Sequence, residues 1–388
     1  MHYVSPEQHT DIMYGRVKMT PLVEELVSTP EMQRLKNISQ DVLPQSCIPY
    51  PVTSRFEHCL GVYYLSRLVI KSGLNCFSKR NENLLSVASL LHDAGNPALS
   101  HLSEPFLEQL TGKNGESFLW ERLSRTKADL ILNRHGFDLK EIVQFVTGQA
   151  QPFSTVLNGS MDIDNLDNVG RYWFVSHKGR RRFDARLIAS SFRYSDHRWH
   201  LPYKCFEAAE KWQEARRAVY RMIYGNPHLN IAMMVYRALG LAFFAKEIKE
   251  QFFHLDDEEA LAHLLFCNSE CASIVRQVMA GVWHKEIVSK QTTEPSEKLL
   301  DVLKHWNCRL LLADYICEKC QLPKSAICVY IGEGRDNRKI TLPFSTQKGF
   351  KYLDGDTAPI FRLKVYVAPE FEEKKNCVRR VIRKLNLF

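Results

Sequence analysis

Residues 83–93 read NLLSVASLLHD, an almost wholly apolar run that ends in adjacent histidine and aspartate residues. Its length and apolar character predict a helix that is buried on all sides. Gly95 and Pro97 follow and end the helix. A carboxylate at the end of such a helix needs a positive partner, because an unpaired buried charge is costly. His92 and Asp93 are therefore candidates for ion pairing or metal ligation.

Two other predicted helices carry polar residues beside apolar stripes. In a helix from about Phe56 to Lys71, the i, i+4, i+7 spacing places His58 on the apolar stripe. A helix from roughly 161 to 176 carries Asp164 beside its stripe. Each residue alone has an ordinary explanation, as a core histidine or a solvated carboxylate. Together, two imidazoles and two carboxylates suit a borderline divalent metal such as manganese, iron, cobalt, nickel or zinc.

The composition is that of a globular protein, with 45% hydrophobic and 25% charged residues in a chain of 388. It excludes collagen and low-complexity disorder. No apolar run reaches membrane-spanning length, and the first residues lack the pattern of a signal peptide. The eleven cysteines have no disulfide-scaffold spacing, so we expect reduced thiols in a cytoplasmic, non-secreted protein without membrane contact. The net charge of +8 favours anionic ligands such as phosphates without diagnosing nucleic-acid binding.

The fold class predicted from these patterns is mainly α, with a small α+β module at the C-terminal end. Residues 1–322 form the predicted helical domain, with a core at about 10–240, and residues 323–388 form the strand-and-helix module. Among the helices predicted for the body are two long ones, at 116–132 and 296–320. The elements predicted for the module are strands at 326–331, 339–342 and 361–367 and a basic helix at about 369–385.

Four segments of the chain carry a family resemblance, TPEMQRLKNISQDV (29–42), YPVTSRFEHCLGVYYLS (50–66), HDAGNPALSHLSE (92–104) and DIDNLDNVGR (162–171). Their order and spacing resemble the H…HD…D signature of the HD-domain metal-dependent phosphohydrolases. The flanking residues resemble the dGTPase and SAMHD1-like branch, which hydrolyses dNTPs. The resemblance covers roughly residues 10–240. It implies an HD-domain helical bundle and a metal-dependent phosphohydrolase acting on a nucleotide.

The resemblance also implies roles for particular residues. The metal ligands would be His58, His92, Asp93 and Asp164. Arg55 stands where the family has a phosphate-binding arginine. His101 would act as general acid or base and Glu104 would orient it, with Asp93 also assigned to catalysis. With Arg55, the residues expected to contact substrate are Asn96, Asn168 and Arg171.

Several positions depart from the pattern of the dNTP triphosphohydrolases. Asn96 replaces a second phosphate-contacting histidine, and the later His-Glu pair has no clear equivalent. Asn165 replaces a lysine, Asn168 a tyrosine, and Tyr172 falls where an aspartate reads the sugar. The ligand set is complete while the readers of triphosphate and deoxyribose are changed, so we expect phosphoester or phosphoanhydride hydrolysis with a substrate that has possibly changed.

Other readings stay open at this point. Additional histidines, His101 and His135, would hold a second ion in a dinuclear site, which favours a phosphodiesterase. A non-catalytic nucleotide or nucleic-acid sensor is a second alternative, favoured by Asn96. A nuclease is a third, with the basic loop at 178–182 and the basic C-terminal helix as weak support for a nucleic-acid partner. The resemblance is also compatible with a homo-oligomer.

Overall fold

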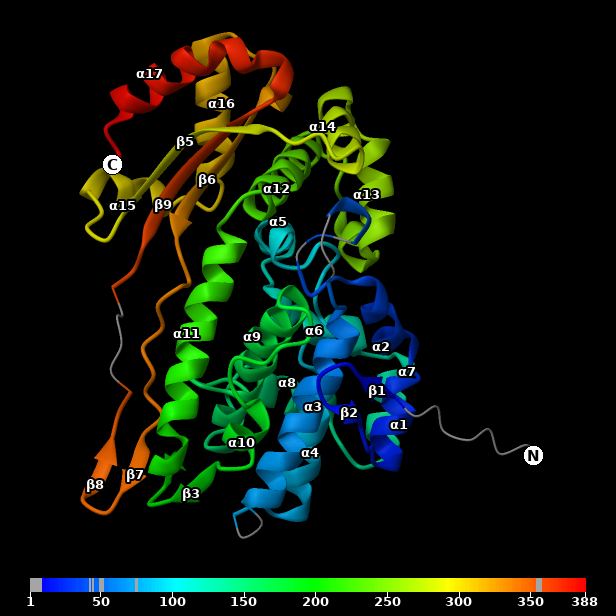
Figure 1. The fold of residues 1–388 in the computed structure, drawn as a ribbon. Helices are drawn as coiled ribbons and strands as arrows, with labels where there is room; N and C mark the ends of the chain where they lie inside the picture. The colour runs from blue at the N-terminus through cyan, green and yellow to red at the C-terminus, as the bar shows by residue number, and fades with distance from the viewer. Residues whose placement is uncertain (1–8, 42, 44, 49–51, 74–75, 354–357) are drawn as a thin grey trace.

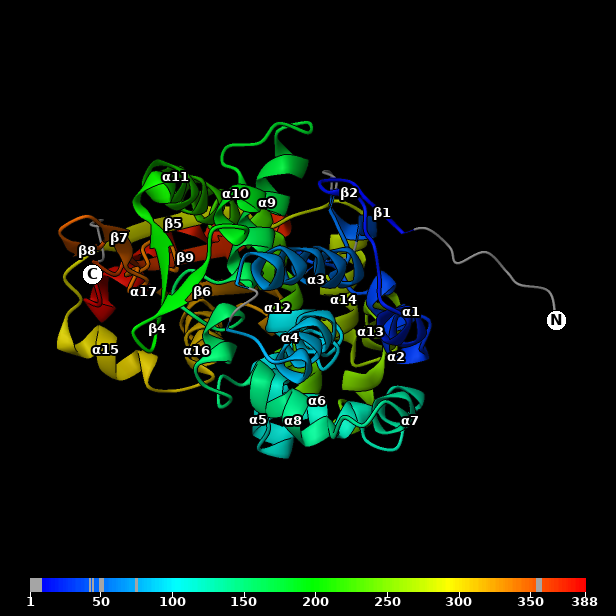
Figure 2. The ribbon, with the colours of Figure 1, turned by 90° about the horizontal axis from the view of Figure 1, so that it is seen from below.

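The computed structural model describes residues 9–388 apart from 42, 44, 49–51, 74–75 and 354–357. It is mainly α-helical with small sheets, as predicted from the sequence (Figure 1). The first half of the chain forms a bundle in which α3 lies between α4 and α9 (Figure 2). The helices of this half are α1 (Pro21–Val27), α2 (Pro30–Arg34), α3 (Arg55–Ser72), α4 (Lys79–Leu91), α5 (Glu104–Thr111), α6 (Gly115–Leu123), α7 (Lys127–Arg134), α8 (Leu139–Val146), α9 (Ile163–Ser176) and α10 (Ala185–Ala189).

Local capping fixes where the helices of the bundle begin. Ser54 and Glu57 form a capping box at the start of α3, in which the Ser54 hydroxyl accepts from the Glu57 N–H and the Glu57 carboxylate accepts from the Ser54 N–H. Asp162 caps α9 by accepting from the Asn165 N–H at 2.7 Å. His92 is the C-cap of α4. These caps place His58, His92 and Asp164 in or next to a terminal turn of their helices.

A close approach between α3 and α9 requires a glycine. A Cβ atom at Gly61 would overlap the side chains of Asp167 and Arg171 on α9. Any larger residue would push the two helices apart, because both of these side chains are fully buried. The contact between α3 and α9 therefore depends on position 61 carrying no side chain.

The second half of the chain adds more helices and two sheets around the bundle. A three-stranded antiparallel sheet has the order β5–β9–β6, and a four-stranded sheet has the order β3–β4–β7–β8. A short β1–β2 hairpin precedes the bundle. The helices are α11 (Phe206–Ile223), α12 (His228–Phe244), α13 (Asp257–Leu265), α14 (Ser269–Met279), α15 (Glu297–Leu303), α16 (Cys308–Cys320) and α17 (Lys375–Leu385). The strands are β1 (Thr10–Asp11), β2 (Gly15–Arg16), β3 (Arg193–Ser195), β4 (Arg198–Pro202), β5 (Lys285–Thr292), β6 (Ile327–Glu333), β7 (Phe344–Thr346), β8 (Gly349–Lys351) and β9 (Phe361–Val367).

Two predicted helices are interrupted in the structure. The helix predicted at 116–132 breaks between α6 and α7, where Arg125 adopts a φ of 64° that a regular helix does not allow. The helix predicted at 296–320 breaks between α15 and α16. Trp306 lies in that turn and packs edge-on against the ring of Phe106, with centroids 5.7 Å apart. The periodicity of the apolar residues reports neither the backbone turn at Arg125 nor the packing of Trp306.

The predicted strand at 339–342 is wrong. Thr341 and Leu342 donate their N–H groups to the Ser160 hydroxyl, at 2.9 and 3.2 Å, instead of joining a ladder. The strand β7 follows two residues later and pairs in parallel with β4 of the helical body. The strand β5 was not predicted, although it pairs with β9 along its length. The sheet and the core are thus shared across residue 323.

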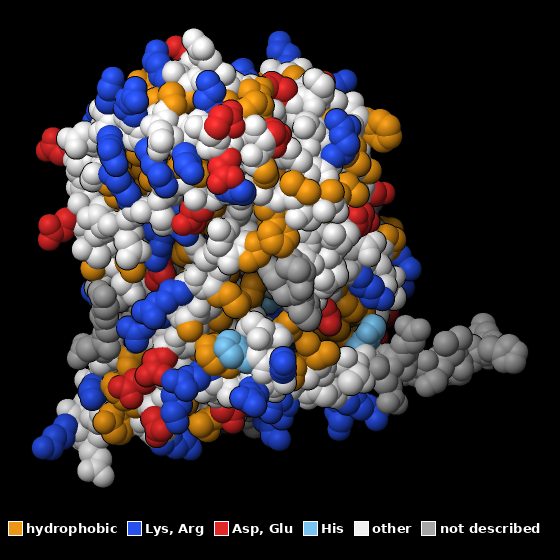
Figure 3. All heavy atoms as spheres, turned by 45° about the horizontal axis from the view of Figure 1, so that its top comes forward, with side chains coloured by type: hydrophobic (Ala, Val, Ile, Leu, Met, Phe, Trp, Pro, Cys, Tyr) orange, Lys and Arg blue, Asp and Glu red, His pale blue; other side chains and the backbone are white. Residues whose placement is uncertain are grey.

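The C-terminal segment ends in the expected basic helix, as a 3-10 turn (Pro369–Lys374) followed by α17. Val378 and Ile382 of α17 are buried against the molecule, and its arginines and lysines lie on the outer face. Lysine and arginine side chains gather over this end of the molecule (Figure 3). Among the described residues, no helix has both the length and the apolar character that a bilayer crossing requires.

A buried histidine makes the stability of this C-terminal region sensitive to acid. His284 precedes β5, and its Nε2–H donates to Gln277 Oε1 at 3.1 Å while Nδ1 lies 3.4 Å from Cys328 Sγ. Burial lowers the pKa of His284 to about 4. Because the unfolded chain binds a proton below about pH 6.5 and the folded chain does not, stability falls as the pH drops from about 6.5 towards 4. We expect the loss at pH 5 to be about 2 kcal/mol.

The measurement is urea unfolding of the wild type and of His284→Asn at pH 7.5 and pH 5. The wild type should be the more stable of the two at pH 7.5, and its advantage should shrink by about 2 kcal/mol at pH 5. A difference between the two proteins that is the same at both pH values would contradict this assignment.

Candidate metal centre

Three helix ends bring four polar side chains to one point inside the bundle. His58 lies in the first turns of α3, His92 and Asp93 directly follow α4, and Asp164 lies in the first turn of α9. The two histidines and Asp93 are almost fully enclosed, and the Asp164 side chain is 36% exposed. These are the four residues that the resemblance implied as metal ligands, and the structure brings all four together.

The donor atoms lie at or a few tenths of an ångström beyond the spacing of ligands around one metal ion. His58 Nε2 lies 3.2 Å from His92 Nε2 and 3.0 Å from Asp164 Oδ1. Asp93 Oδ2 lies 3.8 Å from His58 Nε2 and 3.7 Å from His92 Nε2. Ligand atoms bound about 2.1 Å from an ion are about 3.0–3.4 Å apart at neighbouring positions. The potential ligand atoms of His58, His92 and Asp93 lie within 4.8 Å of one another, so this cluster can hold a metal ion.

The electrostatics of the cluster also favour a cation. Burial opposes the charged imidazole, but hydrogen bonds to Asp164 and Asp167 raise the pKa of His58 to about 9. For His92, burial is likewise outweighed, chiefly by the charge of Asp93, and the pKa rises to about 9. Carboxylates that draw protons onto two buried imidazoles would equally draw a divalent cation to the same nitrogens. The donor set and its charge therefore fit a metal ion.

Hydrogen bonds on the far side of each ring direct Nε2 toward the cluster. His92 Nδ1 donates to the Ser89 carbonyl at 3.0 Å, and His58 Nδ1 donates to Asp167 Oδ2 at 2.7 Å. Because Nδ1 keeps its hydrogen in this arrangement, a metal would displace the proton on Nε2 and bind there, and outer carboxylates of this kind strengthen histidine ligands. Asp167 was not predicted as a site residue, although it lies one turn after Asp164 on α9.

The prediction that Arg171 contacts substrate is wrong. Arg171 is fully buried and donates to both carboxylate oxygens of Asp167, each at 2.9 Å. It also lies 2.8 Å from Asp11 of the β1–β2 hairpin. Against the opposing effect of burial, Arg171 holds the pKa of Asp167 at about 2, so this carboxylate stays charged. Arg171 thus supports the cluster from behind.

A polar cleft of about 520 Å³ opens in front of the cluster. Its lining includes most of the residues that sequence analysis singled out and several from distant parts of the chain. The predicted residues in the lining are Arg55, His92, Asp93, Asn96, His101, Glu104, Asp164 and Asn168. Asn96 Nδ2 is buried and has no hydrogen-bond partner among the described residues, so it is available to a ligand.

Arg55 and the His101–Glu104 pair line this cleft. Arg55 Nη1 donates to Asp93 Oδ2 at 2.8 Å, which keeps that carboxylate charged beside the cluster. His101 Nδ1 donates to Glu104 Oε2 at 2.9 Å. Burial acts to raise the pKa of Glu104, but the charge of His101 and the hydrogen bond with it outweigh burial and lower that pKa. His101 therefore has an oriented ring with Nε2 free of this bond.

The lining of the cleft also includes three arginines and a tyrosine that were not predicted from the sequence. Arg216 and Tyr220 come from α11, and Arg335 and Arg338 come from the connection between β6 and β7. Arg216 stacks on Tyr220 at 4.3 Å, and its Nε and Nη1 atoms are buried without a hydrogen-bond partner among the described residues. No local sequence motif links these positions to the histidines, because they meet only through the tertiary fold.

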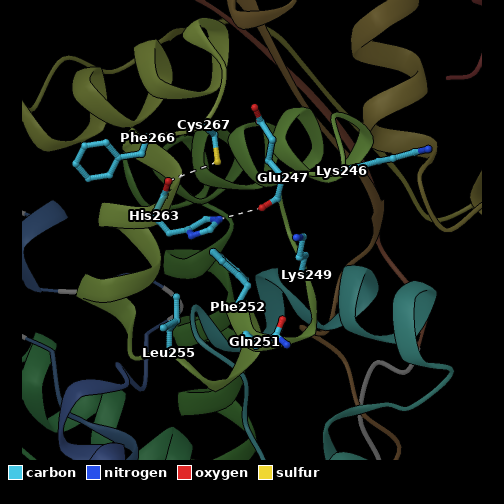
Figure 4. Close-up of a pocket in the computed structure, with 9 residues that line it drawn as sticks. All are labelled: Lys246, Glu247, Lys249, Gln251, Phe252, Leu255, His263, Phe266 and Cys267. Carbon is cyan, nitrogen blue, oxygen red and sulfur yellow. Dashed lines mark hydrogen bonds between the residues drawn. The ribbon is translucent and has the colours of Figure 1, made fainter.

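One predicted residue, His135, and one other hollow of the surface lie outside this cleft. His135, considered as a ligand of a second ion, lies at the end of α7, where its Nε2 is 3.1 Å from Glu25 Oε1, and it does not line the cleft. A separate hollow of about 610 Å³ is lined by the segment that connects α12 to α13, by His263 of α13 and by the two residues 266–267 after it (Figure 4). There His263 Nε2 donates to the Glu247 carbonyl at 3.0 Å, and the Glu247 carboxylate accepts from Asn268. His263 and Glu247 of this hollow are thus paired with protein.

Comparison with known proteins agrees with this geometry. Residues 55–169, from the start of α3 into α9, match the family model of the HD domain. This part of the chain is similar to the HD domain. The matched residues include His58, His92, Asp93 and Asp164, in line with the predicted resemblance to the HD-domain phosphohydrolases.

Relatives extend the similarity beyond the HD domain at low identity. A deoxynucleoside triphosphate triphosphohydrolase SAMHD1 homolog from Dictyostelium discoideum is 26% identical over 180 residues, which is 42% of this chain and 35% of that protein. An uncharacterized protein of Methanocaldococcus jannaschii is 26% identical over 262 residues, 66% of this chain and 52% of that protein. The chain thus spans between about a third and half the length of these relatives.

Solved structures share the fold of nearly the whole chain. A hypothetical protein from Aquifex aeolicus superposes with a TM-score of 0.75 at 20% identity, covering 95% of this chain and 98% of the other. A chain described as a phosphohydrolase from Bacteroides thetaiotaomicron gives a TM-score of 0.69 at 16% identity, covering 92% and 98%. The C-terminal sheets and helices therefore belong to a fold that these two structures share, beyond residues 55–169.

Proposed function

We propose that this protein is a metal-dependent phosphohydrolase that cleaves a phosphoester or phosphoanhydride bond of a nucleotide. The observation that carries the proposal is the convergence of two imidazole nitrogens and two carboxylate oxygens at the floor of a basic, polar cleft. The Dictyostelium relative is named a deoxynucleoside triphosphate triphosphohydrolase SAMHD1 homolog, which supports a nucleotide as the substrate.

Different residues around the cleft would bind the metal ion, bind the phosphate and transfer the proton. His58, His92, Asp93 and Asp164 would hold the ion, and their N and O donors suit manganese, iron, cobalt, nickel or zinc. A divalent cation bound there supplies Lewis-acid activation of water and of a phosphoryl oxygen. Arg55 and Arg216 would bind phosphate oxygens through their planar guanidinium groups. His101, held by Glu104, would deliver a proton from Nε2 to the leaving oxygen.

A turnover panel tests this function. The full chain, loaded in turn with manganese, iron, cobalt, nickel and zinc, is incubated with dNTPs, nucleoside monophosphates and cyclic nucleotides, and released phosphate or nucleoside is measured. We expect hydrolysis of at least one class with at least one metal. Absence of turnover in every combination would overturn the proposal, and thermal stabilisation by a nucleotide without turnover would assign the protein to the sensors instead.

Asp167 provides a sharper test of the metal centre. Replacing Asp167 with asparagine removes the carboxylate that holds His58 Nδ1, and we expect metal affinity or turnover to fall about 10–100-fold. The measurement is metal titration together with steady-state kinetics on the substrate found in the panel. The thermal midpoint is recorded in parallel, because Asp167 also pairs with Arg171. Unchanged affinity and unchanged turnover in a folded variant would contradict the role of Asp167.

A further inference from the structure

The connection between β6 and β7 runs beside α11 from the upper sheet to the β7–β8 hairpin (Figure 1). Asp336, near its start, is buried and accepts two hydrogen bonds from Arg362 of β9, at 2.7 and 2.9 Å. Near its end, the Ser160 hydroxyl accepts from the N–H groups of Thr341 and Leu342. The path of this connection is therefore fixed at both ends by specific hydrogen bonds.

Two arginines of this connection line the same polar cleft. Arg338 Nη2 donates to the Gly159 carbonyl at 2.5 Å and lies 3.7 Å from Asp162 Oδ2. The backbone N–H of Arg335 donates to the Tyr224 hydroxyl at 3.0 Å, and the Arg335 side chain is exposed. Arg335 is thus anchored through its backbone and Arg338 through one guanidinium nitrogen. Each guanidinium group keeps N–H donors that a ligand can use.

These two arginines lie near the buried guanidinium of Arg216. Arg216 is 4% exposed, and its Nε and Nη1 atoms have no hydrogen-bond partner among the described residues. Burial lowers the pKa of Arg216, and the charges of Arg338 and Arg335 lower it further. Asp162, 3.7 Å from Arg338, offsets part of this repulsion. The buried donors of Arg216 still have no protein partner among the described residues, and an anion in the cleft would satisfy them and reduce the remaining repulsion.

We propose that Arg335 and Arg338 act with Arg216 as an anion subsite that binds the phosphate chain of the ligand, apart from the phosphate at the metal cluster. The subsite is completed in cis by the C-terminal part of the chain. This inference rests on the proposed function and deepens it, because such a subsite selects ligands that carry more than one phosphate group. Guanidinium groups suit this task, since each presents a planar pair of donors to phosphate oxygens.

The test measures binding without turnover. Inorganic tripolyphosphate is titrated into the full chain by calorimetry at fixed ionic strength, for the wild type and for the double variant Arg335→Gln/Arg338→Gln. We expect the double variant to bind tripolyphosphate at least about tenfold more weakly, because each lost arginine removes charge-assisted hydrogen bonds. The matched control is Arg379→Gln/Arg380→Gln on the exposed face of α17, which changes the net charge equally and should bind within about twofold of the wild type.

Two outcomes would overturn the subsite. One is unchanged affinity in the double variant, and the other is an equal loss in the α17 control, which would reveal only an effect of net charge. The thermal midpoint of each variant shows that it is folded. Failure of the turnover panel would remove the proposed hydrolysis while leaving this binding result intact. Turnover together with unchanged tripolyphosphate affinity in the double variant would remove the subsite alone.

Discussion

Replacing His92 with alanine is expected to lower the metal content at least tenfold and the rate of phosphate release about a thousandfold. The variant removes one of the two imidazole nitrogens of the cluster, whose Nε2 lies 3.2 Å from that of His58. A thousandfold loss corresponds to about 4 kcal/mol in the activation barrier, within the several kcal/mol that Lewis-acid stabilisation provides. Elemental analysis of the purified protein and steady-state kinetics on the panel substrate measure the two effects.

His135→Ala is the matched control for this prediction. His135 is a partly exposed histidine whose Nε2 contacts Glu25, and it lies outside the cleft. Its replacement should leave metal content and turnover within about twofold of the wild type. A His92→Ala protein that keeps its full metal content and its activity would show that the cluster is not the catalytic centre. Equal losses in the two variants would show that the measurement reports stability.

Replacing Arg171 with methionine should destabilise the fold by about 3–5 kcal/mol, since it leaves the buried carboxylate of Asp11 without a cation and leaves that of Asp167 with His58 alone. Arg171 contacts Asp167 and Asp11, and all three side chains have no exposed area. Urea unfolding of the metal-free protein measures the change directly, because no bound ion then contributes to the stability. A change below about 1 kcal/mol would mean that this ion pair adds little to the fold.

The exposed pair between Arg182 and Glu214 offers the comparison for this variant. Its two charged atoms are 2.7 Å apart, and each side chain is half exposed. Arg182→Met should therefore change the free energy of unfolding by less than about 1 kcal/mol. Combining Arg171→Met with Asp11→Asn should recover part of the lost stability, because the negative charge of Asp11, which pairs with Arg171, is then removed as well.

The convergence of His58, His92, Asp93 and Asp164 could be predicted from the sequence because these residues stand in short, ordered motifs. The apolar run before His92 and the apolar stripe around His58 indicate burial. Buried imidazoles and carboxylates must pair with one another or bind an ion, because an unpaired buried polar group is costly. Arg171 was misassigned although a signal was present. It stands four residues after Asp167, the spacing of an ion pair along a helix. The family motif led to its assignment as a substrate contact. The structure shows instead that α9 buries this side chain fully inside the bundle.

The arginines that α11 and the β6–β7 connection add to the cleft could not be predicted in the same way. Arg216 and Arg338 are separated by more than a hundred residues, and each is flanked by residues of ordinary composition. Their convergence depends on how α11 packs beside the β6–β7 connection, which no local periodicity encodes. The same limit explains β5, because its pairing partner β9 lies far along the chain.

The β6–β7 connection also bears on how proteins of this architecture can diversify. The groups that would hold the ion sit at the ends of packed helices, where a change of length or angle would disturb the whole bundle. Arg335 and Arg338 sit on a link between two strands, a kind of segment that tolerates substitution and insertion. Substitutions or insertions in this connection would therefore change which anion the proposed subsite selects. The helix ends that carry the candidate metal ligands would keep their geometry.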